Sequence, residues 1–346
     1  MGTKPVIGIT MGDAAGIGPE VIVKSLEDLA LLEQIKPVVI GDANALRSVI
    51  ETLGLPSRVI GFDKDAAVDP DTIEVIDLAN LPADLAIGAV SPEGGKAAGE
   101  YIVKAVELWK AREIDAICTA PINKKSLGLG GYDFPGHTEF IAALTHTKEF
   151  AMSFFAGNLR VVLISTHLPL SEAITRVKAE PLIKLIEFTD RSLLSLLKRK
   201  PKIAVAGLNP HASENGMFGT EERDEIEPAI KKCVEIGIDV TGPYSPDTVF
   251  LRGYRGEFDA VIACYHDQAT IAVKSLSFGS AVNVTLGLPL IRTSVDHAVS
   301  DRGALAKASR NVRRPLAQRL QEGGGDDNAH VISAGRRGRD RRARRK

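Results

Sequence analysis

The feature that most restricts the fold is the alternation of short apolar runs with longer amphipathic stretches. Apolar runs rich in β-branched residues occupy residues 6–10, 37–41, 72–77, 114–120, 160–166, 202–208, 260–265 and 281–286. Between them, apolar residues recur at helical spacing over residues 19–35, 43–53, 93–112, 181–198 and 221–236. Near-continuous apolar strands that alternate with helices indicate a largely parallel sheet with both faces covered. The sequence therefore predicts the α/β class.

Composition excludes several other classes of protein. Of the 346 residues, 44% are hydrophobic and 25% are charged, which is close to the average for globular domains. No apolar run reaches the ~18 residues that a membrane span needs, and the first residues lack a signal-peptide pattern. Cys118, Cys233 and Cys264 are too far apart for a metal or redox motif. We therefore expect a cytoplasmic protein without membrane contact.

The charge is distributed unevenly along the chain. Residues 302–346 carry 14 Lys and Arg against 4 Asp and Glu, whereas residues 1–301 carry 29 basic and 40 acidic side chains. A basic tail can mark nucleic-acid contact. However, no aromatic residue is interleaved with these arginines, and the rest of the chain is acidic. We expect no specific nucleic-acid partner and a largely disordered tail.

Three histidines follow three separate apolar runs. Open α/β sheets place their sites beyond the carboxyl ends of the strands, where His167, His211 and His266 would lie. Three imidazoles with an open position can hold a catalytic divalent metal. Each histidine could equally satisfy a loop hydrogen bond, because separations of 44 and 55 residues form no local motif. Further polar candidates near these strand ends are Asn209, Asp267 and Asp247, the last supported only by its turn-like surroundings.

A second set of polar residues favours an anionic ligand. Lysine and arginine together with histidine and threonine would suit a phosphate. Solvated surface charges would explain the same lysines and arginine. The glycine-rich stretch 12–20 lacks the features of the known nucleotide-binding loops, so it predicts either a helix N-terminus open to an anion or a plain turn. The candidate residues are Lys124, His137, Thr138, Lys274, Asn283 and Arg292.

Nine stretches together resemble one known family. They are 10–20, 119–124, 135–139, 165–170, 207–214, 219–222, 265–268, 283–289 and 291–297, as in Thr-His-Leu-Pro-Leu after Ser165 and His-Asp-Gln after Tyr265. With these residues the chain resembles the 4-hydroxythreonine-4-phosphate dehydrogenase (PdxA) family of vitamin B6 biosynthesis. The resemblance extends over residues 7–297.

The resemblance implies an architecture. The fold would be like that of isocitrate and isopropylmalate dehydrogenases, not a Rossmann fold, with two α/β/α subdomains and the active site in the cleft between them. The first subdomain would comprise residues 1–125 and about 285–301, and the second, residues 126–284, would carry the metal ligands and the dimer interface. Residues 302–346 would form a basic tail. The protein would be a homodimer whose active sites are shared between subunits.

The resemblance also implies a reaction. The cofactors would be NAD and a divalent metal (zinc, magnesium or cobalt) on His167, His211 and His266. The substrate contacts would be His137, Thr138, Lys274, Asn283 and Arg292. The family oxidises 4-phosphohydroxy-L-threonine at C3 and decarboxylates it to 3-amino-2-oxopropyl phosphate. The Met11-Gly-Asp sequence looks like the branch that acts on D-threonate or D-erythronate 4-phosphate, so these small phosphorylated hydroxy acids are alternative substrates.

The sequence departs from the family pattern at three places. Ala14 stands where proline is usual, and Ser213 stands where glycine is usual. From about Ala298 the family ending is replaced by an Arg-rich sequence. The codons of residues 303–308, shifted by two bases, can encode a Gly-Thr-Gly-Lys segment similar to the missing one. We therefore predict a frameshift product with reduced NAD affinity, because the missing loop would help to hold the NAD adenosine.

Overall fold

A single mixed sheet runs through the whole molecule. The computed structural model describes residues 4–277 and 281–294. The strand order is β3-β4-β2-β1-β5-β12-β11-β6-β7-β10-β8-β9. The strands are β1 (Val6–Thr10), β2 (Lys36–Gly41), β3 (Arg58–Gly61), β4 (Thr72–Asp77), β5 (Ala116–Thr119), β6 (Ala151–Ala156), β7 (Leu159–Leu163), β8 (Ile203–Ala206), β9 (Val240–Tyr244), β10 (Ala260–Ala263), β11 (Val282–Leu286) and β12 (Ile291–Ser294).

Helices follow most strands and cover the sheet. They are α1 (Gly18–Leu26), α2 (Leu29–Gln34), α3 (Ala43–Leu53), α4 (Pro92–Lys110), α5 (Lys124–Leu129), α6 (His137–Leu144), α7 (Leu170–Thr175), α8 (Ala179–Leu197), α9 (Glu227–Glu235), α10 (Pro246–Tyr254) and α11 (His266–Leu276). A 3₁₀ turn spans Pro210–Glu214, and a π-helical turn spans Glu222–Ile226. The predicted α/β class is therefore confirmed.

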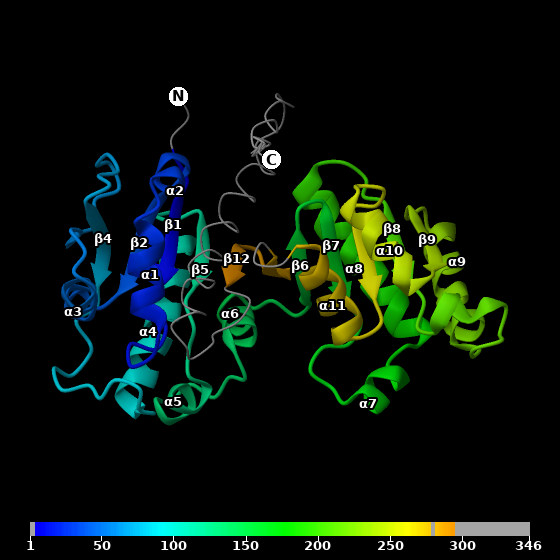
Figure 1. The fold of residues 1–346 in the computed structure, drawn as a ribbon, viewed down its shortest axis with the longest axis horizontal. Helices are drawn as coiled ribbons and strands as arrows, with labels where there is room; N and C mark the ends of the chain where they lie inside the picture. Colours follow the sequence, from blue (N-terminus) through cyan, green and yellow to red (C-terminus); the bar gives the residue numbers. More distant parts are fainter. Residues whose placement is uncertain (1–3, 278–280, 295–346) are drawn as a thin grey trace, which may run out of the picture.

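The molecule has two lobes joined by a central ribbon (Figure 1). We call β1–β5 with α1–α6 the first lobe and β7–β10 with α7–α11 the second lobe. The central ribbon is β12, β11 and β6, in which β11 runs antiparallel to both neighbours. Figure 1 shows α5 and α6, which follow β5, on the same side of the molecule as α7, which follows β7. The carboxyl ends of strands from both lobes thus face one side.

Local sequence signals explain where individual helices begin and end. The Asp42 carboxylate accepts hydrogen bonds from the backbone N–H groups of Asn44 and Ala45, and so caps the N-terminus of α3. Gly54 ends the same helix with a φ of +63°, a conformation that costs glycine little. Ser91 caps α4 by accepting from the Gly94 N–H, and Pro92 follows in the first turn.

The hydrophobic core is separate in the two lobes. One buried cluster fills the first lobe and includes Ile9, Ile40, Tyr101 and Phe140. In the second lobe, consecutive residues of a strand belong to different buried clusters, because their side chains point to opposite faces of the sheet. Figure 1 shows this second lobe covered by helices on both sides of its strands. The predicted subdomain boundaries near residues 125 and 285 stay predictions.

The structure corrects two details of the sequence prediction. The single helix expected over residues 19–35 is two helices, because Asp28 caps a new one by accepting from the Ala30 N–H. The sheet is parallel within each lobe, but the central ribbon contains antiparallel pairs. Strands β3, β6, β9 and β12 were not predicted. Within residues 4–277 and 281–294, no helix combines the length and apolarity needed to cross a bilayer.

Candidate active site

The three predicted metal ligands lie after three adjacent strands. His167 follows β7, His211 follows β8 and His266 begins α11 after β10, and the sheet order is β7-β10-β8. The rings of His167 and His266 have their centroids 5.5 Å apart, with an interplanar angle of 44°. His167 is exposed and His266 is half-buried. Both imidazoles are therefore open to a ligand.

Side-chain to backbone hydrogen bonds tie these strand ends together. The Ser165 hydroxyl donates to the Cys264 carbonyl at 3.1 Å, which joins β7 to β10. Gln268 accepts from the Cys264 N–H at 2.8 Å and donates to the Gly207 carbonyl at 2.8 Å, which joins β10 to β8. The relative positions of the three histidine loops thus depend on Ser165 and Gln268.

The loop that carries His211 is held by a buried carboxylate. Glu222 accepts from the backbone N–H groups of Leu208 and Asn209 at 2.8 and 2.7 Å. It also accepts from the Asn209 side-chain amide at 2.9 Å. Asn209, predicted as a site candidate, therefore fixes the loop through Glu222.

Five consecutive residues of this loop have left-handed backbone angles. The φ angles of residues 211–215 lie between +44° and +64°. Side-chain-bearing residues rarely adopt this conformation, and it persists only where surrounding contacts impose it. Ser213, which replaces the usual glycine, is one of the five, with a φ of +64°.

The donor set fits a metal in part. His266 Nδ1 lies 2.7 Å from Asp267 Oδ1, an arrangement that orients the ring and leaves Nε2 for a metal. Within the described part of the chain, however, no three His, Cys, Asp or Glu side chains gather closely enough to hold a metal ion. The structure brings His167 and His266 together, but the His211 ring instead lies 6.2 Å from that of Phe218. The three-histidine site stays a prediction.

A buried arginine forms the second part of the site. Arg292 on β12 is only 4% exposed. Its Nη1 donates to the hydroxyls of Thr138 at 3.2 Å and Thr285 at 3.3 Å, and its Nη2 donates to that of Thr119 at 2.9 Å. Burial lowers the pKa of Arg292 to about 10, so the group remains charged at neutral pH. Among residues 4–277 and 281–294, no carboxylate forms an ion pair with it.

His137 lies beside this arginine at the N-terminus of α6. Burial of the ring and the nearby charges of Arg292 and Lys124 hold its pKa well below its ordinary value of 6.5, although a hydrogen bond to the backbone of Ala120 opposes the shift. Its Nε2 is buried without a partner among the described residues. At neutral pH His137 is therefore uncharged and has a ring nitrogen available for a ligand.

The remaining predicted residues lie around the three histidines and around Arg292 with His137. Lys124 is exposed at the start of α5 and lies close enough to lower the pKa of His137. Lys274 is half-buried two turns along α11 from His266, and Asn283 is half-buried on β11. Asp247 is exposed near the start of α10 and accepts from the Ser245 hydroxyl at 2.6 Å. In the part of the chain that the structure describes, no hydrogen bond or ion pair joins Asp247 to the three histidines.

Thr285 and Glu222 were missed as individual candidates. Both belong to stretches that carry the family resemblance, but neither ends a strand in the way that the histidines do. Their contacts join residues far apart in sequence, because Arg292 and Thr119 are 173 residues apart. Only the assembled sheet makes these contacts visible.

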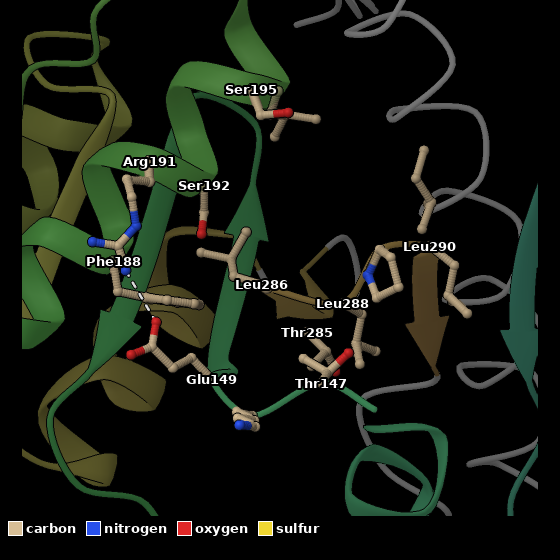
Figure 2. A pocket seen from close by; sticks show the side chains of 15 residues that line it. Thr147, Glu149, Phe188, Arg191, Ser192, Ser195, Thr285, Leu286, Leu288 and Leu290 are labelled. Atoms are coloured by element: carbon tan, nitrogen blue, oxygen red, sulfur yellow. Dashed lines mark hydrogen bonds and ion pairs between the residues drawn. The ribbon is translucent and has the colours of Figure 1, made fainter. Parts of the chain in front are cut away.

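A separate pocket of about 740 Å³ lies between α8, residues 147–149 and the β11–β12 turn. Figure 2 shows it lined by Phe188, Leu286 and Leu288, with Arg191 paired to Glu149. The two charged groups of that pair are 3.0 Å apart. None of the residues predicted from the sequence lines this pocket, but Thr285, which contacts Arg292, does, so the pocket borders the site at that residue.

Comparison with known proteins decides the family. The family model described as "Pyridoxal phosphate biosynthetic protein PdxA" matches residues 33–307. The chain belongs to the PdxA family. As a member it is an oxidoreductase, as predicted.

Relatives within the family carry two different names. A D-threonate 4-phosphate dehydrogenase of Cupriavidus necator is 47% identical over 299 residues, which cover 86% of this chain and 90% of that protein. A 4-hydroxythreonine-4-phosphate dehydrogenase of Desulforapulum autotrophicum is 42% identical over 301 residues, which cover 86% and 88%. The crystal structure of a 4-hydroxythreonine-4-phosphate dehydrogenase from Klebsiella pneumoniae is similar with a TM-score of 0.84 and 39% identity, over 93% of this chain and 100% of that one.

Proposed function

We propose that this PdxA-family protein is an NAD-dependent dehydrogenase of a four-carbon hydroxy acid that carries a 4-phosphate. The observation that carries the proposal is the buried guanidinium of Arg292, which contacts three hydroxyls and no carboxylate in the described residues. A buried charge is costly unless an opposite charge compensates it. A substrate phosphate would supply that charge and would be held by arginine in a defined orientation.

D-Threonate 4-phosphate is our first candidate for the substrate, and 4-hydroxythreonine 4-phosphate is the second. Two relatives at 47% and 48% identity are both named for D-threonate 4-phosphate, whereas relatives at 41–42% identity carry either name. Both acids carry a hydroxyl at C3, β to the carboxylate. Oxidation there passes the C3 hydride to NAD, releases the hydroxyl proton and gives a β-keto acid. Loss of CO₂ leaves an enolate, and its protonation gives a ketone phosphate.

The residues of the site have distinct roles in this proposal. Arg292 and Thr138 bind the phosphate, and remote binding energy then fixes C3 for hydride transfer. Neutral His137 can accept a hydrogen bond from the substrate. His167, His211 and His266 would hold a divalent cation, with Asp267 orienting His266. When bound, such a cation polarises the substrate oxygens and stabilises negative charge on them.

We also propose a homodimer that covers the surface around the histidines. Leu170 on α7 is 57% exposed, and Met217 and Phe218 beside the His211 loop are 72% and 43% exposed. Leu170 follows His167 in the chain, and the Phe218 ring lies 6.2 Å from that of His211. Exposed large apolar side chains beside a site are typical of interaction surfaces. Sedimentation of the chain as a dimer, and as a monomer after L170E with M217E, would support this; a wild-type monomer at micromolar concentration would refute it.

The function is tested by NADH formation with the two candidate acids and with D-erythronate 4-phosphate. Zinc, magnesium and cobalt are supplied in separate reactions. We expect turnover that requires the 4-phosphate, with D-threonate 4-phosphate the best substrate, and much weaker turnover of the unphosphorylated acids. Comparable activity on unphosphorylated acids would contradict the role of Arg292.

A further inference from the structure

We propose that Thr119 and Thr285 are positioning residues, which act through Arg292 and hold it in place for a ligand phosphate. The inference rests on the proposed function and extends it to two residues outside the expected substrate contacts. Both threonines are buried, at 1% and 3% exposure. Their hydroxyls contact the guanidinium from different strands, β5 and β11.

The contacts fix the guanidinium in one orientation. Arginine has five N–H donors in a rigid plane. Nη1 has two hydroxyl partners, Thr138 and Thr285, and Nη2 has one, Thr119. Nε has no partner among the described residues. Two donors therefore remain, one on Nε and one on Nη2, and together they can match two oxygens of one phosphate.

Thr285 orients the Thr138 hydroxyl as well as the arginine. Its hydroxyl lies 3.3 Å from that of Thr138, and both contact Nη1. Since Thr138 is on α6, its hydroxyl is oriented by the same threonine that orients the guanidinium. Thr119 completes the arrangement from the first lobe, with its oxygen 3.4 Å from the Thr293 carbonyl. The guanidinium is thus held between the first lobe and the central ribbon.

Neutral partners preserve the charge of the arginine for its ligand. A carboxylate at either threonine position would neutralise the guanidinium and repel an anion. A hydroxyl instead satisfies a donor without adding charge. Strand residues are also stiff at χ1 when they are β-branched, so each threonine oxygen has few alternative positions. The arrangement orients Arg292 without a carboxylate in direct contact, although the charge of Glu139 acts on it from a greater distance.

The test replaces each threonine by valine and by serine. Valine removes the hydroxyl at similar size, and serine keeps the hydroxyl. For T119V and T285V we expect the KM for the 4-phosphorylated substrate to rise about tenfold to hundredfold with a smaller change in kcat, because a buried charged donor loses its partner. T119S and T285S should restore most of the affinity. T189V is the control, because Thr189 is fully buried on α8 away from the arginine.

A binding measurement makes the test independent of turnover. Inorganic phosphate is titrated calorimetrically into the wild-type chain and each variant, and thermal melting checks that each variant is folded. Weakened phosphate binding in folded T119V and T285V, with normal binding in both serine variants and T189V, supports the inference. Normal binding in the valine variants overturns it while leaving the proposed function intact. Absence of phosphate binding by the wild-type chain overturns both.

Discussion

At the level of single residues, the buried charge of Arg292 sets function against stability. The guanidinium is 4% exposed and has only hydroxyl partners in the described residues. A site that holds a charge ready for a ligand is destabilised until the ligand arrives. The arginine should therefore limit the stability of the ligand-free protein.

Replacement of this arginine by methionine tests that trade-off. R292M should melt at the same temperature as the wild type or higher, because an apolar side chain of similar length replaces a buried charge that has no ion-pair partner among the described residues. Its affinity for the phosphorylated substrate should fall at least hundredfold. Added phosphate should raise the melting temperature of the wild type and leave that of R292M unchanged. A large loss of stability in R292M would show that the three threonine contacts outweigh the cost of burial.

The depressed pKa of His137 predicts a pH dependence of stability. Its pKa in the folded protein lies well below the ordinary 6.5, so below pH 6.5 the unfolded chain takes up a proton that the folded chain does not. The free energy of unfolding should then fall with decreasing pH, by up to about 1.4 kcal/mol per pH unit from this group. Urea unfolding between pH 7.5 and 5.5 measures the slope. H137Q should lose less stability over that range, and equal slopes would contradict the prediction.

At the level of elements, the histidine loops were predictable because they follow buried strands. An apolar run followed by His167 or His266 marks a strand end, and strand ends in an α/β sheet meet at one edge. The break between α1 and α2 was not predictable from periodicity, because apolar spacing continues across Asp28. The antiparallel central ribbon was not predicted either. Its strand β12 is only four residues long, and its position in the sheet depends on the strands that pair with it.

Ser213 offers a stabilising substitution in the His211 loop. Its φ of +64° disfavours any side chain, and the family pattern has glycine there. S213G should raise the free energy of unfolding by about 0.5–1 kcal/mol. Glycine relieves the left-handed backbone strain, and this gain exceeds the cost of the greater entropy that glycine has in the unfolded chain. Chemical denaturation measures the change. S25G, within helix α1, is the control. It should destabilise by about 1 kcal/mol or more, because glycine disfavours the helix and the buried Ser25 hydroxyl no longer donates to the Val21 carbonyl. A destabilised S213G would mean that the serine makes a compensating contact.

The buried Glu222 carboxylate should determine how well the same loop binds metal. In E222Q the amide oxygen can still accept from the backbone N–H groups of Leu208 and Asn209, but the NH₂ group then faces the Asn209 side-chain amide, a donor that bonds to Glu222 Oε2 in the wild type. We expect zinc affinity to fall about tenfold to hundredfold, as for other residues that orient metal ligands. Calorimetric titration of zinc checks this, with E227Q on the outer helix α9 as the control. Unchanged affinity in E222Q would separate the loop from the metal site.

At the level of the whole molecule, the family and the α/β class followed from the sequence, whereas the assembled site did not. The nine stretches that resemble the PdxA family are each local in sequence, so each could be recognised without the others. The contacts of Arg292 connect β5, α6 and β11, so they depend on the whole sheet. The predicted frameshift from about Ala298 and the basic tail lie outside the described residues.

The altered ending gives a prediction about the cofactor. The sequence predicts that the family segment is replaced from about Ala298, although the family model matches as far as residue 307. If the segment is replaced, NAD affinity should be lower than in a variant in which that segment is rebuilt, while phosphate binding at Arg292 is unchanged. Titration of NAD by fluorescence compares the two proteins, and the nucleotide sequence shows whether a second frame encodes the family ending. Equal NAD affinity would contradict the prediction.

The path of the chain through the central ribbon also determines when the first lobe can be completed during synthesis. Strand β5 has β1 on one side and β12 on the other, and β12 pairs Arg292 with Ile117. The Thr119–Arg292 contact spans 173 residues. At roughly 5–20 residues per second, a ribosome needs about 10–35 s to make that span. During that interval the nascent first lobe presents an unpaired edge strand, a template for aggregation that chaperones would have to shield.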